Sequence, residues 1–511
     1  MERISSGKRI NNAGDDAAGA AISDRMTATI RALDMSIRNA ADVLSMAQVA
    51  EGALDEHSQA LQRIRELSIQ AATDILNSEQ RIYLQTEANQ LLDEMDRVAR
   101  DTTFNEIAVL DGTFADRRFQ IGSHEREKAV ISVANLRIQN LGAYQSETDV
   151  LEASGSANSL AAEGTTGATA AGINSLIDAD DDLTITGLVG TSTVDIADNN
   201  TAKEVAELVN AKFDSTGVSA TASTNLKIQA KGTSAGSATL SIGIIGKNST
   251  ARTISAGVTL ATAVGGSDIT NLSNAINAYS AETGVVATLS ADKATVYLTN
   301  DEGHDIILQD LDWADVGDAN THLLEVTGMD SRVFDANGDE LLSGSAVEVY
   351  DKLFTNSSAS SAGFADSAIV SGQVNMHASH SFTVTTDYGT GSDGLFESSP
   401  GVATLNKVSE LSLRSRSKSL DALKMVDKAL DKIHMERAKL GAVMSRMDQA
   451  IDNLTNVSQN QRASKARIMD ANFASESSRL AKSQILQQSA LNMIAQASRA
   501  QQSILTLLQG M

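Results

Sequence analysis

The seven histidines are the strongest candidate metal ligands in this 511-residue sequence, because it contains no cysteine. His377 and His380 stand three residues apart, a spacing at which two imidazoles can hold one metal ion, but no carboxylate lies beside them. None of the histidines belongs to an HExxH motif, in which a helix holds zinc. We therefore interpret the pair as part of a surface loop and predict no metal site.

Two acidic runs, DADDD at residues 178–182 and DANGD at residues 335–339, have the composition of calcium-binding loops. Neither keeps the EF-hand spacing with its closing glutamate, which supplies the bidentate ligand, so we interpret both as solvated turns. The sequence also lacks a P-loop, a GxSxG motif, and a GxGxxG motif between a strand and a helix. It predicts neither a catalytic site nor a cofactor.

The net charge of −24 is concentrated in the middle of the chain. Residues 151–400 contain 9 basic and 32 acidic side chains, whereas the two ends together are nearly balanced. An acidic exterior argues against nucleic acid or an anionic membrane as a partner, because both repel negative charge. No apolar run reaches the ~18 residues of a membrane span, and the opening MERISSGKRINN lacks the apolar stretch of a secretory signal. We expect no membrane partner, and export, if it occurs, by another route.

The amino-terminal region predicts long helices, since the whole chain contains one proline, the residue that interrupts helices most strongly. We expect one helix over residues 15–73 and a second over 78–100, capped by Ser78. Apolar residues follow three- and four-residue steps, as a coiled-coil seam requires. Polar breaks fall at Glu51 and Ser58, after which the stripe is expected to drift to Ile64, Leu67 and Ala71. The predicted seam positions are Ile30, Leu33, Ile37, Leu44, Leu54 and Leu61.

The carboxyl-terminal region repeats the helical pattern. We expect one helix over residues 404–460 and a second over 461–511. Such helices are marginal alone, because a long helix is stabilised mainly by burying its apolar stripe. Residues 461–511 are therefore expected to be disordered in the monomer and to fold on assembly. The seam positions predicted here are Leu423, Val426, Leu430, Ile433, Leu440, Met447, Ile451 and Leu454.

The middle of the chain is rich in short β-prone runs separated by turn residues, and it contains an internal repeat. Residues 204–224 resemble residues 271–291, with Asn210, Thr216 and Gly217 matched by Asn277, Thr283 and Gly284. Each copy predicts a short helix that turns into a strand.

The fold class we predict is multidomain: a long antiparallel α-helical coiled coil or bundle, formed by the amino- and carboxyl-terminal segments, with β-rich or α+β variable domains inserted between them. The expected divisions are a helical segment with short hairpins (1–145), two outer modules (146–265 and 266–403), and the helices 404–460 and 461–511.

Both ends resemble bacterial flagellins closely. The sequences RISSGKRINNAGDDAAGAAISDRM near the start and LGAVMSRMDQAIDNLTNV and ILQQSALNMIAQA near the end carry the resemblance. It covers roughly residues 1–140 and 404–511, in the order found in the family. The resemblance implies a non-enzymatic structural subunit that self-assembles into the flagellar filament for motility and lies outside the cell. Members of the family usually begin several helical turns earlier, with an asparagine-rich stretch, so part of the innermost filament layer is expected to be missing here.

The resemblance also implies partners. These are further copies of the chain, a type III export chaperone on the carboxyl-terminal helices, and the filament cap and hook-associated proteins. Toll-like receptor 5 reads one segment of the family, QRIRELSIQ in this chain, although the same residues also serve subunit contacts. The matching positions are Gln62, Arg63, Arg65, Glu66, Leu67 and, on the next helix, Glu87.

Three alternatives remain. A hook–filament junction protein shares the helical ends with a weaker match to them. A secreted adhesin would place one continuous coiled coil at a single end of the chain. An enzyme would need an unrecognised site in the middle region.

Overall fold

The computed structural model of the chain forms two compact units. Unit 1 contains residues 1–56, 98–135 and 435–511, and unit 2 contains residues 57–97 and 136–434. The described residues are 2–73, 75–148, 177, 182–232, 235–261, 266–314, 322–334, 340–342, 347–350, 368–386 and 401–509.

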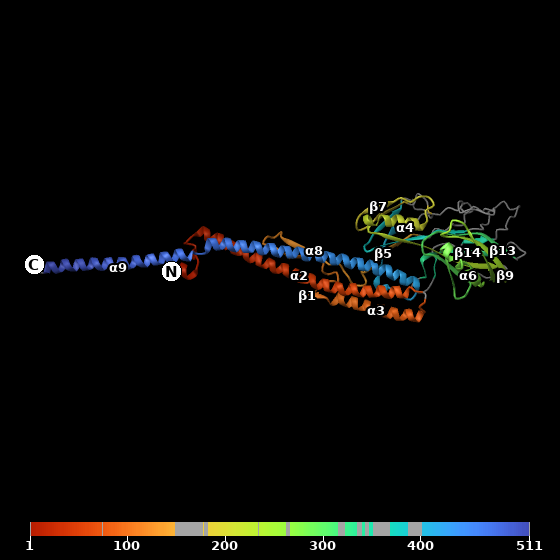
Figure 1. Ribbon diagram of the computed structural model, residues 1–511, viewed down its shortest axis with the longest axis horizontal. Helices are drawn as coiled ribbons and strands as arrows, with labels where there is room; N and C mark the ends of the chain where they lie inside the picture. Colours follow the sequence, from red (N-terminus) through yellow and green to blue (C-terminus); the bar gives the residue numbers. More distant parts are fainter. Residues whose placement is uncertain are drawn as a thin grey trace. The chain divides into compact units, whose positions relative to one another are not determined.

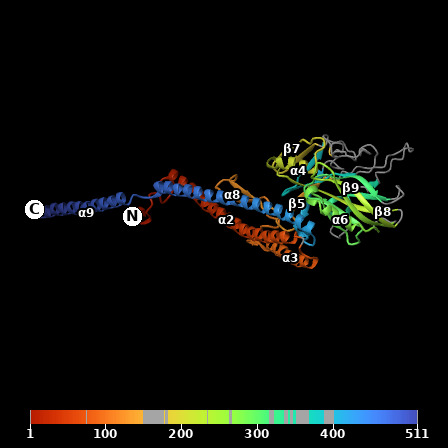
Figure 2. The ribbon, with the colours of Figure 1, turned by 45° about the vertical axis from the view of Figure 1, so that its right-hand side comes forward.

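Long helices form both ends of the chain, as the periodicity predicted (Figure 1; Figure 2). The expected helices 15–73 and 78–100 are confirmed within two residues. The cap of the second helix is Asn77 rather than Ser78: its Oδ1 accepts from Gln80 N at 2.8 Å, and Gln80 Oε1 accepts from Asn77 N at 3.0 Å. The helices at the two ends of the chain are the short α1 (Glu2–Ser6) and the long α2 (Ala17–Ala71), α3 (Ser78–Asp101), α8 (Arg416–Met469) and α9 (Phe473–Gln509).

The carboxyl-terminal helices begin later than predicted. Residues 404–407 form strand β21 and residues 408–410 a 3-10 turn, so α8 begins at Arg416 instead of 404. The reason is tertiary, because β21 (Thr404–Lys407) pairs antiparallel with β5 (Gly142–Glu147). The break between the last two helices lies at residues 470–472 instead of 460.

Short hairpins follow α3 in unit 1, as expected. Strands β1 (Thr103–Phe104) and β2 (Ile107–Ala108) pair through a turn in which Asn105 and Glu106 both have positive φ. Strands β3 (Arg117–Gln120) and β4 (Lys128–Ile131) form the second hairpin.

Three sheets make up most of the described middle region in unit 2. The largest sheet has nine strands and is organised around the long strand β8. The second sheet has the order β10-β9-β13-β17 and the third has the order β20-β19-β6-β7. The strands not yet placed are β6 (Leu183–Thr186), β7 (Thr191–Val194), β8 (Ser219–Gly232), β9 (Gly236–Ile245), β10 (Arg252–Leu260), β11 (Val286–Leu289), β12 (Thr295–Asn300), β13 (Ile306–Ala314), β14 (His322–Phe334), β15 (Glu340–Leu342), β16 (Val347–Tyr350), β17 (Ala368–Val370), β18 (Gln373–Ala378), β19 (Thr383–Thr386) and β20 (Gly401–Val402).

The internal repeat is confirmed in three dimensions. Helices α4 (Ala202–Ala211) and α5 (Phe213–Thr216) lead into β8, and α6 (Thr270–Asn277) and α7 (Ser280–Thr283) lead into β11. Both copies turn at a left-handed glycine, Gly217 with φ of 74° and Gly284 with φ of 70°, a conformation that glycine adopts without strain.

One asparagine in each copy ties the helix to the strand that follows it. The amide of Asn210 donates to Ala220 O and accepts from Ala220 N, both at 2.8 Å. Asn277 makes the same two bonds to Ala287, at 2.7 and 2.8 Å. The matched residues of the repeat therefore have matched structural roles.

The boundary predicted at residues 265/266 does not separate two cores. One apolar cluster combines β8 to β10 with α6, β12 and β13, so it draws on both sides of that boundary. A second cluster contains α4, β6, the start of β8 and the returning strands β18 and β19. The two repeat copies share β8, because its 14 residues are long enough to serve both clusters. No described helix is long and apolar enough to cross a membrane.

Candidate assembly interface

The buried face of α2 follows an uninterrupted heptad pattern, with alternating steps of three and four residues over 39 positions of the helix. This spacing keeps one seam facing a partner helix without drift. The buried positions are Leu33, Ser36, Ala40, Val43, Ala47, Ala50, Leu54, His57, Leu61, Ile64, Ser68 and Ala71.

This seam differs from the predicted one at two positions and at both expected breaks. Ile37 and Leu44 are only half-buried, whereas their neighbours Ser36 and Val43 are buried. Ser58, expected to interrupt the stripe, is itself 3% exposed. The three positions to which the stripe was expected to drift after Ser58 are buried as predicted: Ile64, Leu67 and Ala71. Small and polar side chains such as Ser36 and Ser68 occupy seam positions that a search for large apolar residues passes over. Ile30, Leu33, Leu54 and Leu61 are buried as expected.

Helix α8 has the same spacing. Of the predicted positions, Val426, Leu430, Ile433, Leu440 and Met447 are buried, and Leu423, Ile451 and Leu454 are half-buried. The spacing again continues without a break, and one of its buried positions is Glu436. The buried heptad positions are Ser419, Ala422, Val426, Ala429, Ile433, Glu436 and Leu440.

Ion pairs join α2 to α8 in antiparallel register. Within unit 1, Arg437 lies 3.2 Å from Asp55 and 3.7 Å from Glu51, and Arg462 lies 2.5 Å from Asp34. The next ion pair lies in unit 2. Its arginine is ten residues after Asp55 on α2, and its aspartate is ten residues before Arg437 on α8.

That pair is Arg65 and Asp427, with 2.6 Å between Nε and Oδ1. Its side chains are 42% and 40% exposed, and exposed pairs contribute only ~0–1 kcal/mol each. The main effect of these ion pairs is to favour one alignment of α2 with α8 over shifted alignments in which the seam would also contact apolar residues. No local pattern around Arg437 indicates its ion pairs, because its partners Glu51 and Asp55 lie nearly four hundred residues earlier in the chain.

The candidate receptor segment does not lie on one accessible surface. Arg63 pairs with Glu66 on its own helix and with Glu87 on α3, both at 2.8 Å, and these hydrogen bonds raise the pKa of the Arg63 guanidinium. Gln62 is exposed and Arg65 points to Asp427 of α8. Leu67 is 1% exposed and lies in the core beside the seam residue Ser68. The Arg63–Glu66–Glu87 cluster and Gln62 are exposed and not tied to α8, whereas Arg65 is partly exposed but paired with Asp427.

Helix α9 carries large apolar side chains that nothing in the described chain covers. The segment was expected to be disordered, but the structure has it as a helix, consistent with its composition of alanine, leucine and glutamine. The exposed side chains include Ile485 (65%), Leu486 (57%), Leu491 (59%), Met493 (73%) and Ile494 (66%). Large apolar side chains exposed together along one helix are typical of a segment that contacts a partner.

One of the two candidate metal-binding histidines, His377, is buried. His377 is 7% exposed on β18, and its pKa is lowered to about 3 by burial and by the nearby ammonium groups of Lys424 and Lys428. A buried neutral histidine between two cations is a structural residue, so the surface-loop interpretation was wrong for His377. Among the described residues there is no group of three or more acidic, histidine or cysteine side chains that could hold a metal ion.

The acidic runs lie mostly outside the described residues. Residues 178–181 and 335–339 are not described, and the structure places only Asp182, whose Oδ1 accepts from Ile196 N at 2.7 Å. This hydrogen bond joins the residue before β6 to the segment that follows β7. The other residues of the two acidic runs lie outside the described part of the chain.

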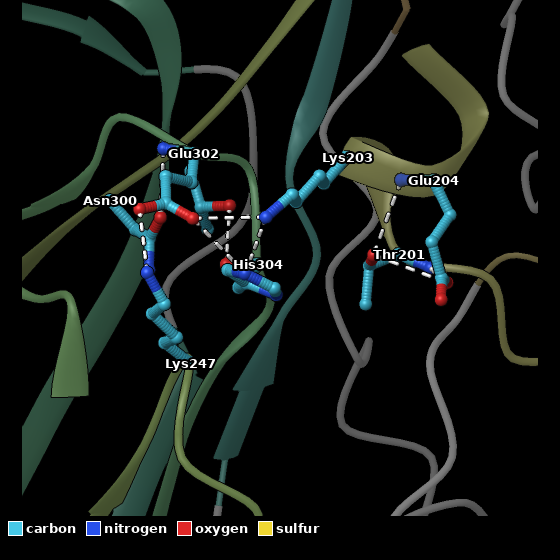
Figure 3. A network of polar contacts seen from close by, with 8 residues as sticks. Thr201, Lys203, Glu204, Lys247, Asn300, Glu302 and His304 are labelled. Atoms are coloured by element: carbon cyan, nitrogen blue, oxygen red, sulfur yellow. Dashed lines mark hydrogen bonds and ion pairs between the residues drawn. The ribbon is translucent and has the colours of Figure 1, made fainter. Parts of the chain in front are cut away.

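A charged cluster that no sequence motif indicated joins α4 to the turns that follow β9 and β12 (Figure 3). The carboxylate of Glu302 lies 3.0 Å from Lys203 of α4 and 3.0 Å from Lys247, which follows β9. These two ammonium groups lower the pKa of Glu302 to about 2. His304 Nε2 lies 3.3 Å from Lys203 Nζ. The residues come from three separate segments, so no local motif announces the cluster, and its geometry is that of a structural ion pair.

Known proteins match this chain over its full length. Residues 1–115 match the family model for the bacterial flagellin N-terminal helical region, and residues 423–508 match that for the bacterial flagellin C-terminal helical region. B-type flagellin of Pseudomonas aeruginosa is 31% identical over 510 residues, covering 99% of this chain and 94% of the relative. Flagellin D of Vibrio anguillarum is 30% identical over 508 residues, covering 99% and 92%.

Among solved structures, FliC from Burkholderia pseudomallei covers 79% of this chain and 99% of its own, with 14% identity and a TM-score of 0.29. A score this low supports no argument about shared architecture.

Proposed function

Because this chain belongs to the bacterial flagellin family, whose members build the flagellar filament, we propose that it polymerises through the helices at its two ends. The paired seams of α2 and α8 would form the folded body of each subunit. The exposed apolar side chains of α9 would then be covered by neighbouring copies. The single observation that supports this most directly is the bare apolar surface of α9, with Met493 73% exposed.

The energetic argument concerns α9. A helix that exposes Ile485, Leu486 and Ile494 gains little from folding alone, because helical stability comes mainly from a buried face. Covering these side chains in a polymer would remove apolar area from water at ~25 cal/mol per Å². Assembly would therefore stabilise α9, and α9 would in turn drive assembly. The seam residues Ile30 to Leu61 of α2 and Leu423 to Leu454 of α8 would act within and between subunits in the same way.

We assign the chain a structural role, not an enzymatic one, because the flagellin family is structural. Secretion through the flagellar type III apparatus to the cell exterior goes with this role. An export chaperone would cover α9 before assembly, since its apolar side chains are a liability in the free chain. The filament cap and hook-associated proteins would meet the same helical ends.

The division of labour between the ends and the middle can be tested by deletion. Strands β5 and β21 are neighbours, with Gln145 opposite Thr404, so residues 146–403 can be replaced by a four-residue Gly/Ser turn that joins the two strands. We expect the shortened chain to form filaments visible by electron microscopy. In the full-length chain, Leu54→Asp should abolish them, because Leu54 is fully buried in the seam.

The matched control for the second variant is Leu188→Asp, at an exposed turn of the middle region where Leu188 is 57% exposed. This variant should polymerise normally. Loss of filaments on deleting residues 146–403, together with normal filaments from Leu54→Asp, would overturn the proposal. Filament formation by the purified chain alone would also distinguish a filament subunit from a hook–filament junction protein.

A second function, recognition by Toll-like receptor 5, is favoured by the exposed cluster of Arg63, Glu66 and Glu87. We propose that this cluster, with Gln62, is the part of the segment that a receptor could contact. Arg63→Ala should reduce receptor signalling in a reporter-cell assay, while Arg97→Ala should not. Arg97 is a fair control because it is a similarly exposed arginine that pairs with Glu94 on α3. Equal signalling by both variants would reject the assignment.

A further inference from the structure

The break between α8 and α9 lies where the sequence contains no helix-breaking residue. Residues 466–476 read ARIMDANFASE and contain neither proline nor glycine, the usual sources of a sharp helix break. The last regular bond of α8 runs from Asp470 N to Ala466 O at 2.8 Å, and α9 begins at Phe473. The local signal at the break is Asn472, which caps α9, and further contacts at the break come from another part of the chain.

That part of the chain is the loop that precedes α2. Arg9 N donates to Met469 O at 2.6 Å, and Ala471 N donates to Gly7 O at 3.0 Å. Lys8 and Asp470 form an antiparallel bridge between these two bonds. The guanidinium of Arg9 adds two bonds to Ile468 O, at 2.8 Å from Nη2 and 3.2 Å from Nε.

These bonds use the groups that a continuous helix would need. In an uninterrupted helix, Ile468 O would accept from Asn472 N and Met469 O from Phe473 N, because each carbonyl accepts from the fourth residue onward. Ala471 N would donate to Arg467 O by the same rule. Arg9 and Gly7 bond these two carbonyls and this amide instead. A carbonyl oxygen can accept a second bond, but Ala471 has one N–H, so its bond to Gly7 O replaces the bond that a continuous helix would make to Arg467 O.

The loop is held in place independently of the break. Ile10 is 3% exposed, and a Cβ on Gly19 of α2 would lie 2.7 Å from its Cδ1, so the two residues pack closely. Asp15 accepts from the backbone amides of Asn11 and Asn12 at 3.0 and 3.1 Å. On the other side of the break, Asn472 caps α9 by accepting from Ser475 N at 3.3 Å.

We propose that residues 7–9 are a latch that keeps α8 and α9 separate, and that Arg9 is its positioning residue. With the latch in place, α9 is an independent helix with its own cap. Without it, the groups of Ile468, Met469 and Ala471 pair along the chain, and residues 416–509 become one helix. The consequence for assembly rests on the proposed function: neighbouring copies would cover α9 only in its separate form.

Hydrogen exchange on the monomer tests the latch without requiring polymerisation. In Arg9→Ala, the amides of Asn472, Phe473 and Ala474 gain helical partners, so their exchange should slow by about threefold to tenfold. A residue that merely stabilised the region would have the opposite effect, because its loss would make the same amides exchange faster. The control is Arg467→Ala, an exposed arginine whose Nε donates to Ala463 O within α8, which should leave the exchange unchanged.

A proline at residue 473 provides a rescue. Phe473 is the first residue of α9, a position that tolerates proline, whereas proline there would disrupt a continuous helix by removing the bond to Met469 O. We expect Arg9→Ala to slow filament elongation at least tenfold and the double variant Arg9→Ala/Phe473→Pro to recover to within about twofold of wild type. Phe473→Ala, tested alone and with Arg9→Ala, controls for loss of the exposed ring and should give no rescue.

Unchanged or faster exchange in Arg9→Ala would overturn the latch, as would a double variant no better than Arg9→Ala alone. Failure of the wild-type chain to polymerise would instead count against the proposed function, and the exchange experiment would still decide the latch.

Discussion

Arg65 and Asp427 stand 362 positions apart in the sequence, yet the Nε of one lies 2.6 Å from the Oδ1 of the other. The pair joins α2 to α8 and shows that the two ends of the chain fold as antiparallel partners. It also engages an arginine of the candidate receptor segment in an intramolecular contact, which raises the pKa of that guanidinium. The same ion pair therefore joins two helices of the fold and occupies an arginine of the candidate receptor segment.

Reversing this pair tests whether it selects the register. Arg65→Asp or Asp427→Arg alone places like charges in contact, and each should lower the free energy of unfolding by ~0.5–1 kcal/mol. The double variant should recover most of that loss. A double-mutant cycle by urea unfolding measures the coupling, and a coupling near zero would mean that the pair contributes nothing to register.

Burial within α2 predicts a graded response to charge. Leu54→Asp places a carboxylate at a fully buried position and should destabilise the chain by more than ~4 kcal/mol, as expected for an unpaired buried charge. Leu44→Asp, at a half-buried position beside the seam, should cost clearly less. Thermal unfolding followed by circular dichroism at 222 nm compares them. Equal losses would indicate that the sequence-based seam, not the one built on Val43, is correct.

The asparagine clamps of the repeat should be worth about as much as two hydrogen bonds each. Asn210→Ala or Asn277→Ala leaves a backbone amide and carbonyl of a buried strand residue without these partners, at a cost of ~1–3 kcal/mol. Asn→Asp keeps the acceptor and loses the donor, so it should give an intermediate loss. Unfolding of the four single variants provides the comparison, and a loss in only one copy would show that the repeat copies differ in role.

Acid should weaken unit 2 through His377. Above pH 6.5 the imidazole is neutral in the folded and unfolded chain alike, whereas between 6.5 and about 3 only the unfolded chain binds the proton. The free energy of unfolding should therefore fall by about 1.4 kcal/mol per pH unit as the pH drops through this range. Lys424 and Lys428 of α8 face the imidazole and oppose its protonation.

The comparison that isolates this effect is His377→Gln, which has no imidazole to titrate. Urea unfolding at pH 7, 6, 5 and 4 should show a smaller decline for this variant than for wild type. Parallel curves would mean that other groups, chiefly carboxylates, account for the acid sensitivity.

The sequence by itself determined the class of fold, the positions of α2 and α3, the hairpins after α3 and the tandem repeat. These features have local signals: a period near 3.5 residues, the scarcity of proline, turn residues, and two matching segments. The same periodicity indicated that the two ends are complementary. It could not identify the true seam, because Ser36, His57 and Glu436 lie on it for geometric reasons that hydrophobicity does not reveal.

Only the tertiary structure decided how distant segments meet. The start of α8 depends on β21 pairing with β5, the shared core depends on the length of β8, and the Glu302 cluster depends on three segments that converge. The break at residues 470–472 depends on the loop at residues 7–9, some 460 positions earlier in the chain. In each case the deciding hydrogen bond or charge comes from a residue remote in sequence, and local propensity carries no information about which remote residue will arrive.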